Sequence, residues 1–169
     1  MANNGKKGIP SQEIKKEIEA AEIHPPTALE KKVFGLLSAE KNGRRKTVFT
    51  EFPYVVLRYF RPGFECFSAW GSVELKAFSN FVEVLGQQTW ESVYRSGGKP
   101  GTKTGLGYTQ YKIDEMKTGA EHLKAVSSLL SEDVGFFELR LSDRVRVHGF
   151  QAQSAFFLVL LDKDHRVFP

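Results

Sequence analysis

The stretch FFELRLSDRVRVHGFQAQSAFFLVLL, residues 136–161, decides the fold class of this 169-residue chain. Apolar and polar residues alternate through its first half, as in strands that bury one face, and it ends in the unbroken apolar run AFFLVLL typical of a buried strand. With the residues that follow, it predicts a meander of four strands, over 136–141, 145–150, 155–161 and 166–168.

The turn between the first two strands determines which side chains share a face. A two-residue turn would place arginines opposite leucines, a poor match for a half-buried sheet. A three-residue loop over 142–144 instead pairs Leu139 with Val147 and leaves Arg144 in the loop. We prefer this register, and we expect its apolar face to pack on a helix predicted over 112–131.

The opposite face of the same hairpin carries Arg140 across from Arg146 and Glu138 across from His148. Like charges directly opposite each other destabilise a sheet by up to about 1 kcal/mol. Two interpretations stay open. Either Glu138 bridges to the arginines on an ordinary surface, or the arginine pair binds an anion such as phosphate beside a histidine that titrates near neutral pH.

Upstream of the meander, strand and helix patterns alternate. Aromatic and β-branched residues over 47–70 predict two or three strands. Apolar residues at helical spacing predict a helix over 73–86, and Thr89 is expected to cap a shorter one. This order of elements predicts an α+β fold in which an antiparallel sheet packs on helices.

Residues 1–46 are predicted to form a basic N-terminal extension to a domain at 47–169. Two short helices are expected in it, one over 11–23 and one beginning at the capping box of Thr27. The formal charge of +4 lies here: residues 1–50 hold ten Lys and Arg against six Asp and Glu, whereas the rest of the chain holds fourteen of each. A nucleic-acid site would therefore have to be local, because the body of the protein is neutral.

The sequence also indicates where the protein resides. No apolar run is long enough to cross a bilayer, and the N-terminus lacks the apolar core of a secretory signal. The single cysteine, Cys66, excludes an internal disulfide and fits a reducing compartment. We expect a cytoplasmic protein without a membrane partner.

Neither a metal nor a cofactor is expected. The turn Asp162–His165 holds two acids and a histidine, but no further residues at metal-ligand spacing complete a site. The Gly-rich loop over 96–107 resembles a phosphate-binding P-loop, yet Thr102 stands where that motif requires glycine.

The segment QQTWESVY, residues 87–94, has two interpretations. The spacing of Gln87, Trp90 and Tyr94 loosely follows that of peptides that plug into the groove of replication sliding clamps. The same residues also fit a short helix that buries Trp90 and Tyr94 in the core, and this is the favoured interpretation.

The segments FFELRLSDRVRVHGF and FFLVLLDKDHRVFP resemble the C-terminal region of a group of bacterial proteins. These share an arginine-containing turn, then an arginine and a glycine, an apolar strand, and an Asp-x-x-His-x-Val-x-Pro ending. QTW before a Gly-rich loop is also similar. The resemblance covers scattered positions over 74–169, and the order of helix and meander is similar to RelE-type toxins of bacterial toxin–antitoxin systems.

That resemblance implies an RNA-cleaving toxin with an antitoxin partner. Members fold as a small antiparallel sheet packed on helices, and many cleave RNA with concave basic residues and no metal. On this chain, Arg140 and Arg146 would contact the scissile phosphate, and His148 or His165 would serve as general acid or base with the RNA 2′-OH as nucleophile. This chain is longer than those toxins and lacks the C-terminal tyrosine that many of them use.

The leading hypothesis is therefore a cytoplasmic toxin that acts on RNA as a metal-independent endoribonuclease. The alternative is a non-enzymatic growth inhibitor that binds a replication protein such as the sliding clamp through Gln87, Trp90 and Tyr94. A third possibility is a module with no activity of its own, since a fold does not fix a function.

Overall fold

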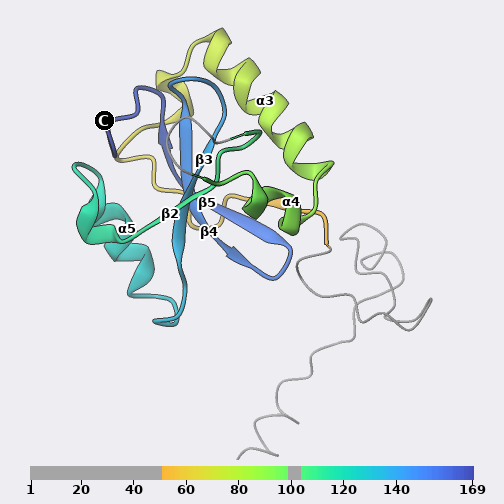
Figure 1. The fold of residues 1–169 in the computed structure, drawn as a ribbon. Helices are drawn as coiled ribbons and strands as arrows, with labels where there is room; N and C mark the ends of the chain where they lie inside the picture. The colour runs from red at the N-terminus through yellow and green to blue at the C-terminus, as the bar shows by residue number, and fades with distance from the viewer. Residues whose placement is uncertain (1–50, 99–103) are drawn as a thin grey trace, which may run out of the picture. The chain divides into compact units, whose positions relative to one another are not determined.

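The computed structural model describes residues 51–98 and 104–169, so the predicted N-terminal extension, with its helices at 11–23 and after Thr27, lies outside the described residues. A five-stranded sheet forms the centre, in the order β1-β5-β4-β3-β2 (Figure 1). Its strands are β1 (Tyr54–Val56), β2 (Thr109–Tyr111), β3 (Phe136–Arg140), β4 (Arg146–Ala152) and β5 (Ala155–Asp162).

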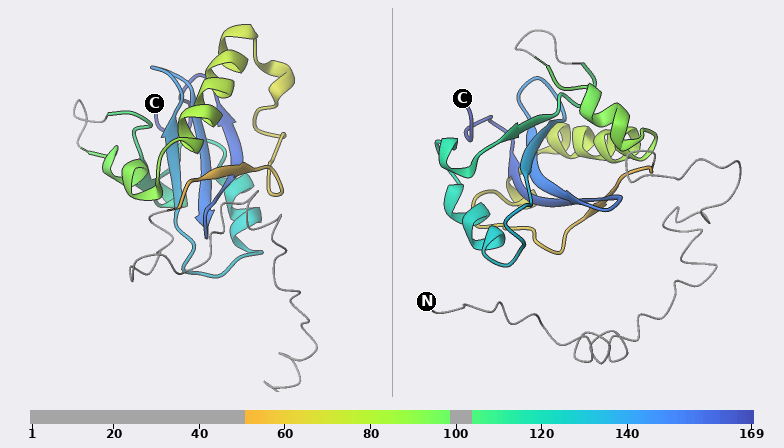
Figure 2. Two further views of the ribbon diagram at one scale, coloured as in Figure 1. Left: turned by 90° about the vertical axis from the view of Figure 1, so that its right-hand side faces the viewer. Right: turned by 60° about the horizontal axis from the view of Figure 1, so that its bottom comes forward.

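Helices cover both faces of this sheet (Figure 2). On one face lie α3 (Ser72–Gly86) and α4 (Trp90–Arg95), and on the other lies α5 (Ala120–Ser127). Two short 3-10 helices, η2 (Phe67–Ala69) and η3 (Ile113–Glu115), occupy the connections. All sheet pairs are antiparallel except β1 with β5, which is parallel. The predicted α+β class with a mainly antiparallel sheet is confirmed.

The predicted hairpin register is also confirmed. Leu139 pairs with Val147, and the loop is closed by a hydrogen bond from the backbone N–H of Leu141 to the carbonyl oxygen of Val145 (2.9 Å). Arg144 lies in that loop, where its guanidinium meets Asp164 at 3.3 Å. The three-residue loop works because it keeps Leu139, Leu141, Val145 and Val147 together on one face of the hairpin.

The prediction that a helix over 112–131 covers that apolar face is wrong. Leu139 and Val147 pack in the cluster that contains Phe81 of α3 and Trp90 of α4. The predicted helix over 112–131 is likewise wrong. The helical conformation ends at Met116, whose backbone is extended, and the left-handed Gly119 (φ 77°) then precedes a new helix, so only η3 and the shorter α5 form.

The other local predictions fare differently along the chain. The helix predicted over 73–86 forms as α3, and the side chain of Thr89 caps α4 by accepting a hydrogen bond from the N–H of Ser92 (3.3 Å). Of the two or three strands predicted over 47–70, only β1 forms within the described residues. No described helix is both long and apolar enough to span a membrane.

A β-bulge in β5 shifts the pairing of β5 with β4 at the centre of the sheet. The register shifts between His148 and Gly149, so that Val159 has no direct partner on β4. Gly149 sits at this irregularity because a Cβ there would lie 2.1 Å from the backbone oxygen of Phe157. The bulge places His148 opposite Leu160, on the face of the sheet that α5 covers.

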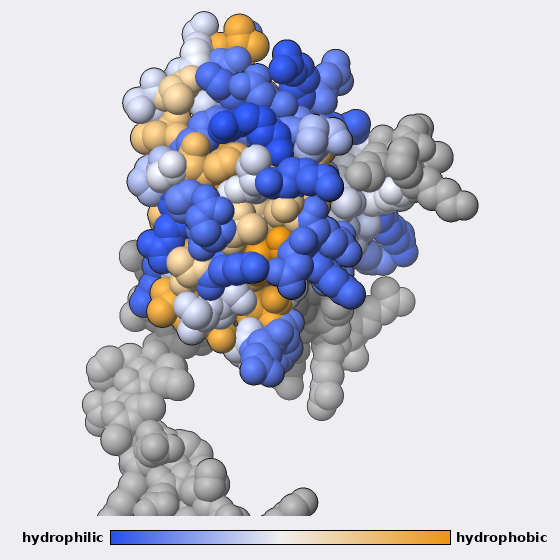
Figure 3. Space-filling view, turned by 90° about the vertical axis from the view of Figure 1, so that its left-hand side faces the viewer, coloured by the Kyte–Doolittle hydropathy of each residue, from blue (hydrophilic) through white to orange (hydrophobic). Residues whose placement is uncertain are grey.

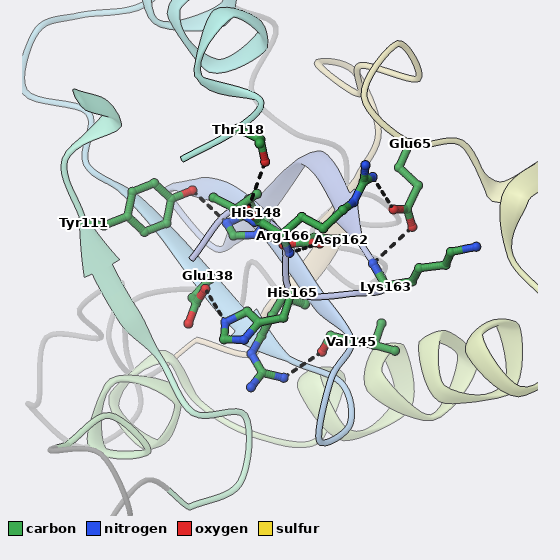
Figure 4. A network of polar contacts seen from close by, with 12 residues as sticks. Glu65, Tyr111, Thr118, Glu138, Val145, His148, Asp162, Lys163, His165 and Arg166 are labelled. Carbon is green, nitrogen blue, oxygen red and sulfur yellow. Dashed lines mark hydrogen bonds and ion pairs between the residues drawn. The ribbon is translucent and has the colours of Figure 1, made fainter. Parts of the chain in front are cut away.

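The fourth predicted strand, over 166–168, does not form. After β5 the chain turns, and residues 163–169 (the C-terminal segment) cross the α5 side of the sheet in an irregular conformation (Figure 4). His165 has φ 56°, in the left-handed region, so the chain cannot continue there as a strand. The C-terminal segment is therefore a cover over the sheet rather than part of it.

Candidate active site beneath the C-terminal segment

Charged and titratable side chains gather on three neighbouring strands, on the α5 side of the sheet. We call this set the polar face, and it consists of Glu138 and Arg140 on β3, Arg146 and His148 on β4, and Asp162 at the end of β5. The register places them in adjacent rows, because Glu138 pairs with His148 and Arg146 lies between Arg140 and Asp162. The apolar strands thus carry a compact polar site.

Two buried carboxylates fasten the C-terminal segment over this face (Figure 4). Asp162 accepts the backbone N–H groups of Arg166 (2.8 Å) and Val167 (2.9 Å). Glu65 accepts the N–H of Lys163 (3.1 Å) and pairs with the Arg166 guanidinium (3.0 Å). Asp162 and Arg166 are four residues apart at the chain's last turn, yet their side chains do not form a surface pair. Instead Asp162 is buried and binds backbone, because the guanidinium is directed to Glu65.

Residues just before α5 also hold the C-terminal segment, through hydrogen bonds. The hydroxyl of Thr118 donates to the carbonyl oxygen of Arg166 (3.0 Å), and the N–H of Lys117 donates to that of Val167 (3.0 Å). The guanidinium of Arg166 also lies over the ring of Phe64, 4.6 Å from its centroid. The segment is therefore held on both sides, which fixes the position of His165.

His148 is completely buried beneath this cover. Its Nδ1 lies 3.0 Å from the hydroxyl of Tyr111, and its Nε2 lies 3.6 Å from Oδ2 of Asp162. Burial, with the nearby Glu138 and Asp162 charges, raises the pKa of Tyr111 well above its usual range, so the phenol stays a donor. We therefore assign the ring proton to Nε2, facing Asp162.

The pKa of Asp162 is lowered. Burial by itself would raise it, but the His148 ring and the two N–H groups of the C-terminal segment outweigh burial. Asp162 therefore carries its charge in the folded protein and orients both His148 and the segment. In this structure His148 has no surface for a substrate to touch.

Tyr111→Phe tests this buried chain of contacts. The change removes only the hydroxyl and leaves Nδ1 of a buried ring without a partner, so we expect a loss of about 1–3 kcal/mol in the free energy of unfolding. Tyr59→Phe is the matched control, because the Tyr59 ring packs on Phe150 while its hydroxyl makes no hydrogen bond to a described residue. Equal denaturation midpoints for the two variants would contradict the assignment.

His165 and Glu138 form the accessible part of the site. Nε2 of His165 lies 3.9 Å from Oε2 of Glu138, and both atoms are buried without a hydrogen-bond partner among the described residues. The His165 side chain keeps 32% of its surface exposed, and with Nε2 buried this exposed part presents Nδ1. The pair therefore has the order carboxylate, ring, open nitrogen that acid–base catalysis uses.

A pocket of about 330 Å³ opens in front of this pair. Its walls are Tyr111, Glu115 and Phe168 together with β2. Burial lowers the pKa of His165, and the positive charge of Arg146 lowers it further. His165 is therefore neutral at neutral pH, and Nδ1 can take a proton from a group in the pocket.

The two arginines are fixed by different loops. Arg146 donates from Nη1 to the carbonyl oxygens of Ser142 (2.7 Å) and Val145 (3.1 Å). Arg140 donates from Nη2 to the carbonyl oxygen of Gly105 (3.2 Å). Burial, with the facing Arg140, lowers the pKa of Arg146 from its ordinary value, as expected for a cation partly withdrawn from water. Oε2 of Glu138 instead faces Nε2 of the neutral His165 ring at 3.9 Å, so the interpretation in which Glu138 serves only to bridge the arginines does not describe this carboxylate.

The residues of the clamp-binding alternative do not share the surface. Gln87 is exposed, but Trp90 is fully buried, and its indole N–H donates to the carbonyl oxygen of Ser154 (3.1 Å). Tyr94 is half-buried and stacks on Trp90, with their ring centroids 5.7 Å apart. The core interpretation of this helix describes its observed packing, and clamp binding stays a prediction that would need Trp90 to leave the core.

Two contributors to the site had no local sequence signal, and the role of a third was not predicted. Glu65 lies about a hundred positions from the residues it fastens, and Tyr111 belongs to a strand of three residues. Glu138 was noticed only as a partner for the arginines. A carboxylate in the apolar context FFELRL is the one signal that could have indicated its burial, since a buried acid requires a partner.

Among the described residues, no group of three or more His, Cys, Asp or Glu side chains is arranged to hold a metal ion. No protein-family model, curated protein or solved structure matches this chain.

Proposed function

We propose that this protein is an endoribonuclease in which His165 is the general base, Glu138 orients it, and Arg140 and Arg146 bind the scissile phosphate. The observation that carries the proposal is the His165–Glu138 pair, in which one buried nitrogen faces a carboxylate, the ring lines a pocket, and Arg146 is near enough for its charge to lower the pKa of the ring. RNA cleavage by such a set requires no metal, because the substrate brings its own nucleophile, the 2′-OH.

The reaction follows from these positions. Nδ1 of His165 takes the proton of the 2′-OH, and the 2′ oxygen bonds to phosphorus. The bond from phosphorus to the 5′ oxygen breaks, and that oxygen takes a proton from water in the open pocket. The products are a 2′,3′-cyclic phosphate and a 5′-hydroxyl end. Glu138 stabilises the imidazolium that forms, and the arginines stabilise the charge that develops on the phosphate.

His148 has a supporting role in this proposal. Its ring is held between Tyr111 and Asp162, and Asp162 in turn holds the backbone that follows His165. The sequence placed His148 and His165 on equal terms as general acid or base. The difference in exposure favours His165, because a general base must reach the proton it removes.

In a cell, such cleavage would inhibit growth, which is the toxin activity that the sequence resemblance implies. An antitoxin would then be the natural partner. The neutral body of the chain argues against broad electrostatic attraction to RNA, so binding would depend on the local arginines.

Purified protein with EDTA and single-stranded RNA tests the proposal. We expect cleavage that leaves 2′,3′-cyclic phosphate ends. Arg146→Leu should reduce the cleavage rate at least about tenfold while changing the free energy of unfolding by less than about 1 kcal/mol, because the half-buried guanidinium is partly desolvated.

Arg144→Leu is the matched control, since Arg144 lies in the same hairpin but is exposed and paired with Asp164. It should cleave at the wild-type rate. Intact RNA at high protein concentration would contradict the nuclease, and equal losses in both arginine variants would contradict a specific phosphate contact at Arg146.

A further inference from the structure

A second pocket lies on the opposite face of the sheet from His165. It has a volume of about 500 Å³, within the usual range for small-ligand sites, and β2, β3, β4 and α4 all contribute to it. Aromatic rings make one wall: Tyr94 and Tyr108 meet edge to face at 4.8 Å, and Tyr108 lies 4.9 Å from Phe137. We call this the aromatic pocket.

Its polar groups are amides and phenols rather than cations. Gln110 and Gln151 line it. The Tyr108 hydroxyl donates a hydrogen bond to the side-chain oxygen of Gln110, and the Tyr94 hydroxyl donates one to the side-chain oxygen of Gln151. Burial, with the neighbouring Tyr94, raises the pKa of Tyr108 to about 12, so its hydroxyl stays neutral. No described lysine, arginine or histidine lines the pocket, and its one charged residue is Asp133. A phosphate would find no partner here, whereas a flat uncharged ring with donors and acceptors on its edge would.

The aromatic pocket is connected with the proposed active site through one residue. Gln110 lines the aromatic pocket on one face of the sheet and the His165 pocket on the other. It also lines the two hollows between them, beside Lys112. This is possible because β2 is the edge strand of the sheet, with no described strand beyond it. A polymer can therefore pass around the edge and occupy both pockets.

We propose that the aromatic pocket binds an unpaired nucleobase of the RNA strand whose phosphate lies at His165. This rests on the proposed function. The base stacks on the ring of Tyr108, and the amide of Gln110 with the carboxylate of Asp133 contacts its edge. The pocket thus selects single-stranded RNA, because a paired base cannot leave its helix to enter it.

Nucleosides test this site separately from cleavage, because they contain the base and no phosphate. We expect at least one of adenosine, guanosine, cytidine and uridine to bind the full-length protein, measured by equilibrium dialysis. Tyr108→Ala should weaken that binding at least about fivefold, whereas Tyr108→Phe should stay within about twofold, since the ring is kept. Gln110→Ala, at an exposed position, should change which nucleoside binds best.

The outcomes distinguish this inference from the proposed function. RNA cleavage without nucleoside binding, and with cleavage positions unchanged in Gln110→Ala and Tyr108→Ala, would overturn the base site and leave the nuclease standing. Nucleoside binding without cleavage would support the base site and overturn the nuclease. Binding of N-acetyltryptophanamide in place of every nucleoside would indicate a protein side chain as the occupant and would overturn the inference.

Discussion

Replacing His165 by asparagine is expected to reduce the rate of RNA cleavage by about 10²- to 10⁴-fold, the usual contribution of a general base. Asparagine is chosen because it adopts the left-handed backbone conformation that His165 holds at φ 56°, so the C-terminal segment keeps its course. The substitution removes the nitrogen that accepts the proton and leaves the arginines in place.

His122→Asn is the matched control. His122 lies on α5, packs against Phe64 and meets Glu121 at 3.4 Å, so it shares residue type and partial exposure with His165 but lies outside the pocket. It should cleave RNA at the wild-type rate. If His165→Asn retains more than about a tenth of that rate, His165 is not the base.

The pH dependence of RNA cleavage is a second test of His165 as the general base. Because burial and Arg146 lower the pKa of His165, the neutral base persists below the ordinary value of about 6.5, and cleavage should decline only as the pH falls through the lowered value. Arg146→Leu removes the cation and should move this decline to higher pH. The free energy of unfolding depends on pH in the same direction. Because His165 binds a proton more readily in the unfolded chain, the free energy of unfolding falls as the pH drops from about 6.5 through the lowered pKa.

The hairpin was predictable from sequence because its information is local. Alternation fixes two faces, and a short loop allows few registers, so the opposition of Arg140 with Arg146 and of Glu138 with His148 followed from the pattern alone. The choice of covering helix was not local. Both α3 and α5 carry apolar stripes, and which stripe meets Leu139 depends on the chain path around the whole sheet.

The surroundings of the hairpin were less accessible to sequence reasoning. Residues 166–168 read as a strand, yet the backbone of Arg166 and Val167 bonds to Asp162, Thr118 and Lys117 rather than to a neighbouring strand. This cover turns the polar face from a solvated surface into a buried site with an opening at His165. Figure 3, which views this side of the molecule, shows apolar surface interspersed with hydrophilic side chains rather than a uniformly charged face.

Glu65→Ala is expected to lower the free energy of unfolding by about 3 kcal/mol. The Glu65 carboxylate is almost fully buried and accepts hydrogen bonds from the Trp70 indole, the N–H of Lys163 and the guanidinium of Arg166. Alanine leaves the indole without a partner and releases the segment that carries His165. Cleavage should therefore fall as well, even at temperatures at which the variant remains folded.

Two further variants separate the contributions of Glu65. Glu65→Gln keeps an oxygen for Trp70 and Lys163 but loses the charge that faces Arg166, which is half-exposed and can be hydrated instead, so the expected loss is about 1 kcal/mol. Glu74→Ala is the control for an exposed carboxylate with one backbone partner, the N–H of Gly71 (2.8 Å), and should cost at most about 1 kcal/mol without changing cleavage. Chemical denaturation gives the stabilities and single-turnover cleavage gives the rates. A Glu65→Ala protein that loses stability but cleaves RNA normally would show that Glu65 supports the fold without positioning His165, because a displaced base cannot hold its rate.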